Sequence, residues 1–129
     1  MVVDASALLE ALLHTSTGEA VERRLARPGE RLRAPHLIDV EITQALRRKV
    51  ARGEVSESRG RVALESLAFF PIRRYPHGPL LSRVWELRNN LTAYDAMYVA
   101  LAEALDAPLL TRDQRLAAAA GHHARIELV

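Results

Sequence analysis

Cysteine, lysine and long apolar runs are scarce or missing in this chain. The sequence has no cysteine, and its only lysine is Lys49. Without cysteine the protein forms no disulfide, binds no zinc through thiolates and uses no cysteine nucleophile. No stretch approaches the roughly 20 uninterrupted apolar residues of a membrane-spanning helix. The first residues, MVVDASALLEALL, contain two acids and no basic leader, so they do not resemble a signal peptide and we expect a cytoplasmic protein.

Several familiar binding motifs are missing as well. The chain has no phosphate-binding loop of the Walker type, no GxGxxG motif and no GxSxG nucleophile elbow. Five histidines are present but lack the spacing of a metal site: His14, His36, His77, His122 and His123. Neither nucleotide binding through these loops nor serine hydrolysis nor a histidine-bound metal is therefore indicated.

The composition predicts one folded domain that spans residues 1–129. With 129 residues and 49% hydrophobic residues, the chain can bury roughly two thirds of its unfolded surface. The net charge is only +2, yet 11 of the 18 basic residues fall between residues 23 and 61. Such a concentration fits contact with a phosphate backbone, and it fits an ordinary solvated surface equally well.

Short apolar runs alternate with helical patterns along the chain. Strands are predicted at residues 2–3, 32–34, 71–75, 109–110 and 126–129. Helices are predicted at residues 5–13, 19–26, 37–51, 59–70, 80–88, 92–105 and 114–120. Strands that alternate with helices form a parallel sheet covered on both faces. The predicted fold class is therefore α/β, with a short, mainly parallel sheet of four or five strands.

Four acidic residues occupy unusual positions in this pattern. Asp4 and Asp113 follow predicted strands, at the end where an open parallel sheet binds its ligands. Glu41 and Asp95 lie on the apolar sides of predicted helices. An ionised carboxylate in apolar surroundings requires compensation by other groups, so these positions point to a site.

Each acid also has a purely structural explanation. Asp4 and Asp113 are good N-caps for the helices that follow them. Asp95 can form a capping-box-like pair with the threonine three residues earlier, and Glu41 can pair with Arg48 further along its helix. Together, however, four carboxylates that converge on one cleft repel one another unless a cation lies between them. The sequence therefore favours a divalent-metal site and phosphodiester chemistry.

Four segments carry these acids with their neighbours: MVVDAS, VEITQAL, TAYDAMYVALAEAL and PLLTRDQRLA. Their sequences, order and spacing resemble the PIN-domain ribonucleases, most closely the VapC-type toxins of bacterial toxin–antitoxin pairs. The resemblance implies a three-layer α/β/α sandwich and RNA cleavage with Mg²⁺ or Mn²⁺. It also implies a homodimer and a small antitoxin protein that blocks the cleft.

The same resemblance suggests roles for particular residues. The four acids of the family's metal site match, in order, Asp4, Glu41, Asp95 and Asp113. Ser6 matches the small polar residue after the first acid, and Thr111 matches the hydroxyl residue before the last. Gln44 departs from the asparagine that these toxins often have three residues after the glutamate, which puts one contact behind the site in doubt.

The chemistry of such a site follows from its ligands. Oxygen ligands select Mg²⁺ or Mn²⁺ over zinc. We expect Asp4, Asp95 and Asp113 to bind the metal directly or through water, and Glu41 to bind it or to act as general base. Because a metal-activated water attacks the phosphate in such sites, the products should carry a 5′-phosphate and a 3′-hydroxyl.

Two other functions compete with a ribonuclease toxin. One is a catalytically silent PIN-fold module that binds RNA or a protein, although the presence of all four acids speaks against it. The other is a different metal phosphohydrolase on a similar sheet, but the segment from Asp4 to Ser6 lacks the second aspartate of the haloacid dehalogenase motif.

Partner surfaces are expected on the apolar helices between Leu8 and Phe70. The large aromatic residues Phe69, Phe70 and Trp85 are expected in the core rather than against RNA. The sequence does not divide the helix surfaces between a second copy of the chain and the antitoxin.

Overall fold

The computed structural model describes residues 1–129 as a five-stranded sheet between two layers of helices. The strands are β1 (Val2–Val3), β2 (Leu32–Pro35), β3 (Ile72–Tyr75), β4 (Leu109–Thr111) and β5 (Ile126–Leu128). The helices are α1 (Ala5–Leu12), α2 (Gly18–Leu25), α3 (Leu37–Ala51), α4 (Glu57–Phe69), α5 (Leu81–Glu86), α6 (Ala93–Ala104) and α7 (Gln114–Ala118), with a short 3₁₀ helix, η1 (Gly78–Leu80).

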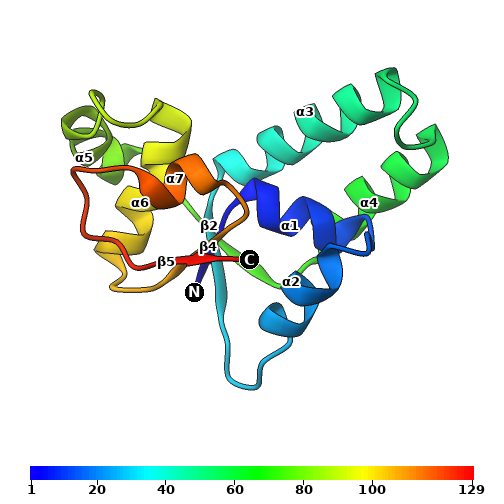
Figure 1. Cartoon of the computed structure of the whole chain (residues 1–129), viewed down its shortest axis with the longest axis horizontal. Coiled ribbons are helices and arrows are strands. Elements are labelled where there is room, and N and C mark those ends of the chain that lie inside the picture. The colour runs from blue at the N-terminus through cyan, green and yellow to red at the C-terminus, as the bar shows by residue number, and fades with distance from the viewer.

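All neighbouring strands are parallel, in the order β3-β2-β1-β4-β5. Figure 1 shows α1 to α4 on one side of the sheet and α5 to α7 on the other. The predicted α/β class and the three-layer sandwich are therefore confirmed, with five strands. Parallel strands leave all their carboxyl ends at one edge, so β1 and β4 both end at the same edge of the sheet.

Local sequence sets the helix starts. The side chains of Asp4, Ser56, Thr92 and Asp113 each accept a backbone N–H of the helix that follows. Such a bond satisfies a donor that would otherwise lack a partner in the first turn. The predicted boundaries agree with the structure to within about two residues, except that the segment predicted as one helix at 80–88 begins as a 3₁₀ turn.

One hydrophobic core of 33 buried residues lies on both faces of the sheet. The central strands β1 and β4 are fully buried, which explains why they are apolar without alternation. Helix α6 buries every residue from Ala96 to Ala102, and its alanines allow a close approach to the sheet. None of the helices combines the length and apolar character needed to cross a lipid bilayer.

Two of the three large aromatic residues lie outside the core, contrary to expectation. Phe69 is 89% exposed at the end of α4, and Trp85 is 68% exposed on α5. The guanidinium of Arg88 lies over the Trp85 ring, 4.6 Å from its centroid. Only Phe70 packs against the core as predicted. The prediction for Phe69 and Trp85 was wrong because the exposure of a residue depends on which face of its helix the sheet covers. The rings of these two residues point away from the sheet.

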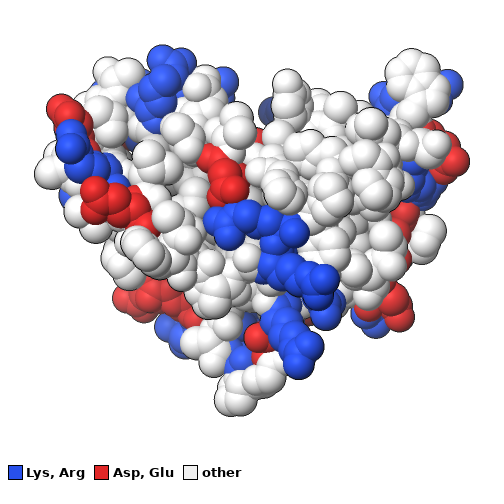
Figure 2. All heavy atoms as spheres, turned by 180° about the vertical axis from the view of Figure 1, so that it is seen from behind, with Lys and Arg blue, Asp and Glu red and all other residues white.

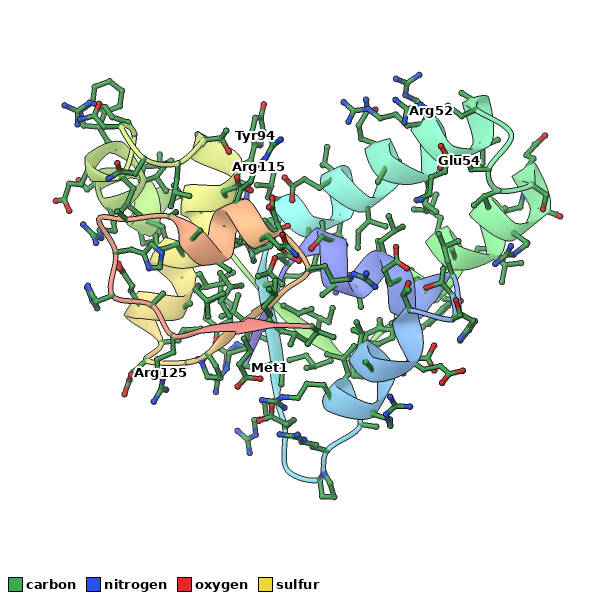
Figure 3. The ribbon with its side chains drawn as sticks, viewed as in Figure 1. Met1, Arg52, Glu54, Tyr94, Arg115 and Arg125 are labelled. Carbon is green, nitrogen blue, oxygen red and sulfur yellow. The ribbon has the colours of Figure 1, made fainter.

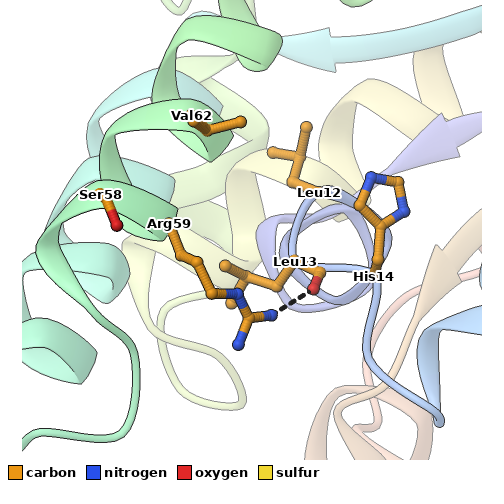
Figure 4. A pocket seen from close by; sticks show the side chains of 6 residues that line it. All are labelled: Leu12, Leu13, His14, Ser58, Arg59 and Val62. Atoms are coloured by element: carbon orange, nitrogen blue, oxygen red, sulfur yellow. Dashed lines mark hydrogen bonds between the residues drawn. The ribbon is translucent and has the colours of Figure 1, made fainter.

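Helices α1 and α4 are joined at their ends by a polar contact. Arg59 of α4 donates a hydrogen bond to the carbonyl oxygen of Leu13, 2.8 Å away, at the end of α1 (Figure 4). Beside this bond lies an open groove of about 310 Å³. Its lining residues are Leu12, Leu13, His14, Ser58, Arg59 and Val62.

Gly18 is required by the close approach of α2 to α1. A Cβ atom at this position would lie 2.5 Å from the carbonyl oxygen of Glu10. We therefore expect Gly18→Ala to lower the free energy of unfolding by about 1–3 kcal/mol, measured by urea denaturation. Gly78→Ala is the matched control, because a Cβ there meets nothing within 4 Å. Equal stability of the two variants would contradict this account of the α1–α2 contact.

Candidate active-site cleft

All four acids identified in the sequence line one open cleft of about 740 Å³. The cleft lies beyond the carboxyl ends of β1 and β4, where Asp4 and Asp113 follow their strands. Residues of α3 form one wall and residues at the start of α6 form the other. The structure thus brings together side chains that are separated by more than a hundred positions in the chain.

Asp4 is the most buried of the four acids, with 6% of its surface exposed. Its Oδ1 accepts hydrogen bonds from the Ser6 hydroxyl (2.7 Å) and the Ala7 N–H (3.0 Å). Its Oδ2 accepts one from the Thr111 hydroxyl at 2.5 Å. Burial raises the pKa of Asp4, these hydrogen bonds oppose the rise, and the charge of Asp95 adds to it. Ser6, expected beside Asp4, and Thr111, expected beside Asp113, therefore both contact the Asp4 carboxylate directly.

Glu41 is held by a tyrosine rather than by an arginine. The Tyr98 hydroxyl donates to Oε2 of Glu41 at 2.6 Å. Burial raises the pKa of Glu41, the bond from Tyr98 lowers it, and the charges of Asp95 and Asp4 raise it further. The alternative that Glu41 forms an ion pair with Arg48 is wrong, since its hydrogen-bond partner is Tyr98.

Asp95 lies in the first turn of α6, where its own N–H donates to the Thr92 hydroxyl at 3.2 Å. Burial raises the pKa of Asp95, and the charge of Asp113 contributes to that rise. Asp113 caps α7, since its Oδ1 accepts the N–H groups of Arg115 (2.7 Å) and Leu116 (3.4 Å). The capping roles considered from the sequence are therefore real, and they coexist with a place in the cleft.

The donor set fits a hydrated divalent cation rather than a fully caged one. No three histidine or acidic side chains lie close enough together to hold a metal ion by themselves. Mg²⁺ is commonly bound through one or two carboxylates and keeps several waters. Mutual repulsion contributes to the raised pKa values of Asp4, Glu41 and Asp95, and a cation in the cleft would relieve it. All four acids therefore line one cleft, but no three of them lie close enough together to hold a bare ion.

The basic residues lie mostly outside the cleft. Five of the eleven between residues 23 and 61 pair with glutamates: Arg23, Arg24, Lys49, Arg52 and Arg61. Figure 2 shows Lys and Arg side chains in a band down the middle of the face opposite to that of Figure 1. Arg48 is the one basic residue that lines the cleft. For the five paired residues, the interpretation as a solvated surface is sufficient.

Two tyrosines of the cleft were missed as site residues in the sequence. Tyr98 lies on the apolar side of α6, which indicates a core residue, but its hydroxyl holds Glu41. Tyr94 lines the cleft with 61% of its surface exposed. The available signal was its place directly before Asp95, in the exposed first turn of the helix.

Known proteins are similar to this chain in sequence and in fold. The PIN domain family matches residues 1–122. Ribonuclease VapC1 of Mycobacterium tuberculosis is 50% identical over 129 residues, which cover 99% of this chain and 96% of that protein. Ribonuclease VapC12 of the same organism is 46% identical over 129 residues, covering 100% and 98%.

Solved structures agree at the level of the fold. The crystal structure of Mycobacterium tuberculosis VapC20, described as a sarcin-ricin loop cleaving toxin, has a TM-score of 0.72 at 15% identity and covers 95% of both chains. That of VapBC2 from Rickettsia felis, bound to a DNA fragment from its promoter, has a TM-score of 0.69 at 12% identity, covering 98% and 96%. The chain therefore belongs to the PIN-domain family and, within it, to the VapC ribonucleases.

The raised pKa of Glu41 predicts a pH-dependent cost to folding. Because the folded chain holds this proton more tightly than the unfolded chain, stability present at low pH is lost as the pH rises through the raised pKa. Glu41→Gln keeps an acceptor for Tyr98 and removes the charge. In EDTA at about pH 7.5, we expect a gain on the order of 1 kcal/mol in urea unfolding, which disappears near about pH 4.

Glu103→Gln is the control for Glu41→Gln, because the pKa of Glu103 is shifted in the opposite direction. Burial raises the pKa of Glu103, but hydrogen bonds from Arg83 outweigh this and hold it below its usual value. Stability from this group is therefore present at neutral pH and is lost as the pH falls. We expect this variant to lose about 1–3 kcal/mol at neutral pH. A loss at Glu41→Gln of similar size would show that its charge does not oppose folding.

Proposed function

We propose that the protein is a divalent-metal-dependent endoribonuclease that hydrolyses RNA phosphodiester bonds and acts as the toxin of a toxin–antitoxin pair. The observation that carries this proposal is the convergence of four carboxylates on one open cleft, with three of their pKa values raised. Support comes from the VapC ribonucleases that match almost the whole chain at 46–50% identity.

The cleft residues divide the work between holding a cation and moving a proton. Asp4, Asp95 and Asp113 would hold Mg²⁺ or Mn²⁺ directly or through water, as expected for oxygen donors. Such an ion lowers the pKa of a water and offsets charge on the phosphoryl oxygens. Ser6 and Thr111 orient both oxygens of Asp4 by hydrogen bonding.

Glu41 would either contact the cation or take the proton of the attacking water. The bond from Tyr98 fixes the direction of its carboxylate. The pKa of Glu41 is raised towards neutral pH. A general base is most effective when its pKa lies near the working pH. Asp95 lies in the first turn of α6 and Asp113 caps α7. Both carboxyl groups therefore lie beside helix N-termini, whose dipoles favour negative charge.

Cleavage should depend on both the cation and the acids. We expect the purified protein to cut RNA with Mg²⁺ or Mn²⁺ and to stop in EDTA. Asp4→Asn and Asp95→Asn should each lower the rate at least about 100-fold, with unchanged circular dichroism. The matched control is Asp106→Asn, because the side chain of Asp106 is 99% exposed and lies outside the cleft. RNA binding by the wild type without any cutting would favour the catalytically silent module instead.

The chemistry of the ends tests the mechanism separately. Attack by a water leaves a 5′-phosphate and a 3′-hydroxyl, whereas attack by the ribose 2′-hydroxyl leaves a 2′,3′-cyclic phosphate. Sequencing of RNA ends by methods selective for each terminus distinguishes the two outcomes. Cyclic phosphate ends would overturn the role proposed for the cation and Glu41.

Protein partners are part of the same proposal. We infer a homodimer and a small antitoxin that blocks the cleft, supported by large apolar residues left exposed on α4 and α5: Val62, Leu64, Phe69, Leu81 and Trp85. Sedimentation velocity should give a dimer, and Phe69→Ser should raise the dissociation constant at least about 10-fold, as truncation of an aromatic hot spot does. Arg23→Ser, also on an exposed helix, should leave the dimer intact. A wild-type monomer at micromolar concentration would contradict the homodimer.

A further inference from the structure

The cleft is much larger than a hydrated ion requires. The cleft has a volume of about 740 Å³. Its acidic floor is formed by Asp4, Glu41, Asp95 and Asp113, and its walls carry apolar and aromatic side chains from α3 and α6. Among these, Val40 and Tyr94 are large and mostly exposed, at 67% and 61%. With a cation on the acidic floor, the space fits a nucleotide, because the phosphate would face the cation and the base would meet the apolar walls.

Tyr94 has no visible role in stabilising the fold. It lies outside the core cluster, and its hydroxyl makes no hydrogen bond. Tyr98, one turn further along α6, is buried and bonded to Glu41. Figure 3 shows Tyr94 at the mouth of the opening between the two helical layers. Its place directly before Asp95 puts an open aromatic ring beside the acidic floor.

Arg48 is similarly unengaged within the cleft. It projects from α3, is exposed, and forms no ion pair or side-chain hydrogen bond, although Glu41 lines the same cleft. Most other arginines of the chain have carboxylate, carbonyl or aromatic partners. A free guanidinium at this position is ready to bind a phosphate, which it can do with two parallel hydrogen bonds.

We propose that Tyr94 and Arg48 form a nucleotide subsite in which the Tyr94 ring stacks on a base next to the scissile phosphate and Arg48 holds a neighbouring phosphate. This inference rests on the proposed ribonuclease function and names the residues that position its substrate. Stacking of a base on an aromatic side chain contributes about 1–3 kcal/mol. Because every base has an aromatic face, Tyr94 supplies affinity without reading the sequence by hydrogen bonds.

The test combines protein variants with abasic RNA. The substrate is an RNA of about 20 nucleotides that spans a mapped cut site, with an abasic residue placed in turn on either side of the cut. For Tyr94→Ala we expect kcat/KM on the intact RNA to fall about 5- to 100-fold, mainly through KM. Tyr94→Phe should stay within about 3-fold of the wild type, because the ring and not the hydroxyl makes the contact.

The decisive result is non-additivity. At one abasic position, kcat/KM of the wild type should fall by the same factor as Tyr94→Ala causes on the intact RNA. On that same abasic RNA, kcat/KM of Tyr94→Ala should fall almost no further. Tyr94→Phe is the matched control, since it keeps the aromatic ring that the stacking contact requires. It should show the full abasic penalty. An undiminished penalty in Tyr94→Ala at both positions would overturn the stacking contact.

Arg48 is tested through salt dependence. Equilibrium binding of labelled RNA in EDTA avoids cutting. In this assay, Arg48→Gln should reduce the slope of log affinity against log salt by about 0.7, the value for one phosphate contact on a single strand. Tyr94→Ala should lower affinity and leave the slope unchanged. An unchanged slope in Arg48→Gln would overturn the phosphate contact.

The outcomes separate this subsite from the proposed function. Wild-type cutting with normal kcat/KM and RNA affinity in Tyr94→Ala and Arg48→Gln would refute the subsite and leave the ribonuclease standing. No cutting by the wild type under any divalent cation would refute the ribonuclease, and the subsite with it.

Discussion

The parallel pairing of β1 with β4 is the constraint on which the rest of the cleft depends. Val3 pairs with Leu110, and the next residue of each strand places Asp4 beside Thr111. Helices α1 and α7 begin at this same edge, capped by Asp4 and Asp113. One register therefore fixes two carboxylates, two helix starts and the hydroxyl between them. A shift by one residue would turn each of these side chains to the other face of the sheet.

Capping and function are not alternatives at these positions. A cap fixes the direction of its carboxylate because one oxygen is held by backbone N–H groups. The other oxygen of Asp4 is held by Thr111, so burial leaves the group oriented but partly desolvated. Acids that are buried close to like charges reduce the stability of a metal-free fold. A cation bound in the cleft, as proposed, would explain their presence, in keeping with the general tendency of perturbed pKa values to mark functional sites.

Local features of the fold were predictable from the sequence, and tertiary ones were not. Strands, helices and caps follow from apolar runs and from residues such as Ser56 and Thr92, because these signals act over a few residues. The strand order, the Tyr98–Glu41 bond and the Asp39–Arg74 pair at 2.8 Å depend on segments that meet only in the folded chain. The exposure of Phe69 belongs with these, since hydrophobicity alone does not say which face a layer covers. The acids were found because four carboxylates in one pattern are improbable as caps alone.

The open character of the proposed metal site would constrain how RNA binds. An acidic floor repels a polyanion, and no three side chains are close enough to neutralise themselves by chelating one ion. Favourable contacts would then have to come from a cation shared with the substrate and from the walls above the floor. Only one basic residue, Arg48, lines those walls, so apolar and aromatic surface supplies most of the remaining contact. An enzyme built in this way would bind RNA weakly until cation and substrate are both in place, which would couple its affinity to the carboxylates proposed for the chemistry.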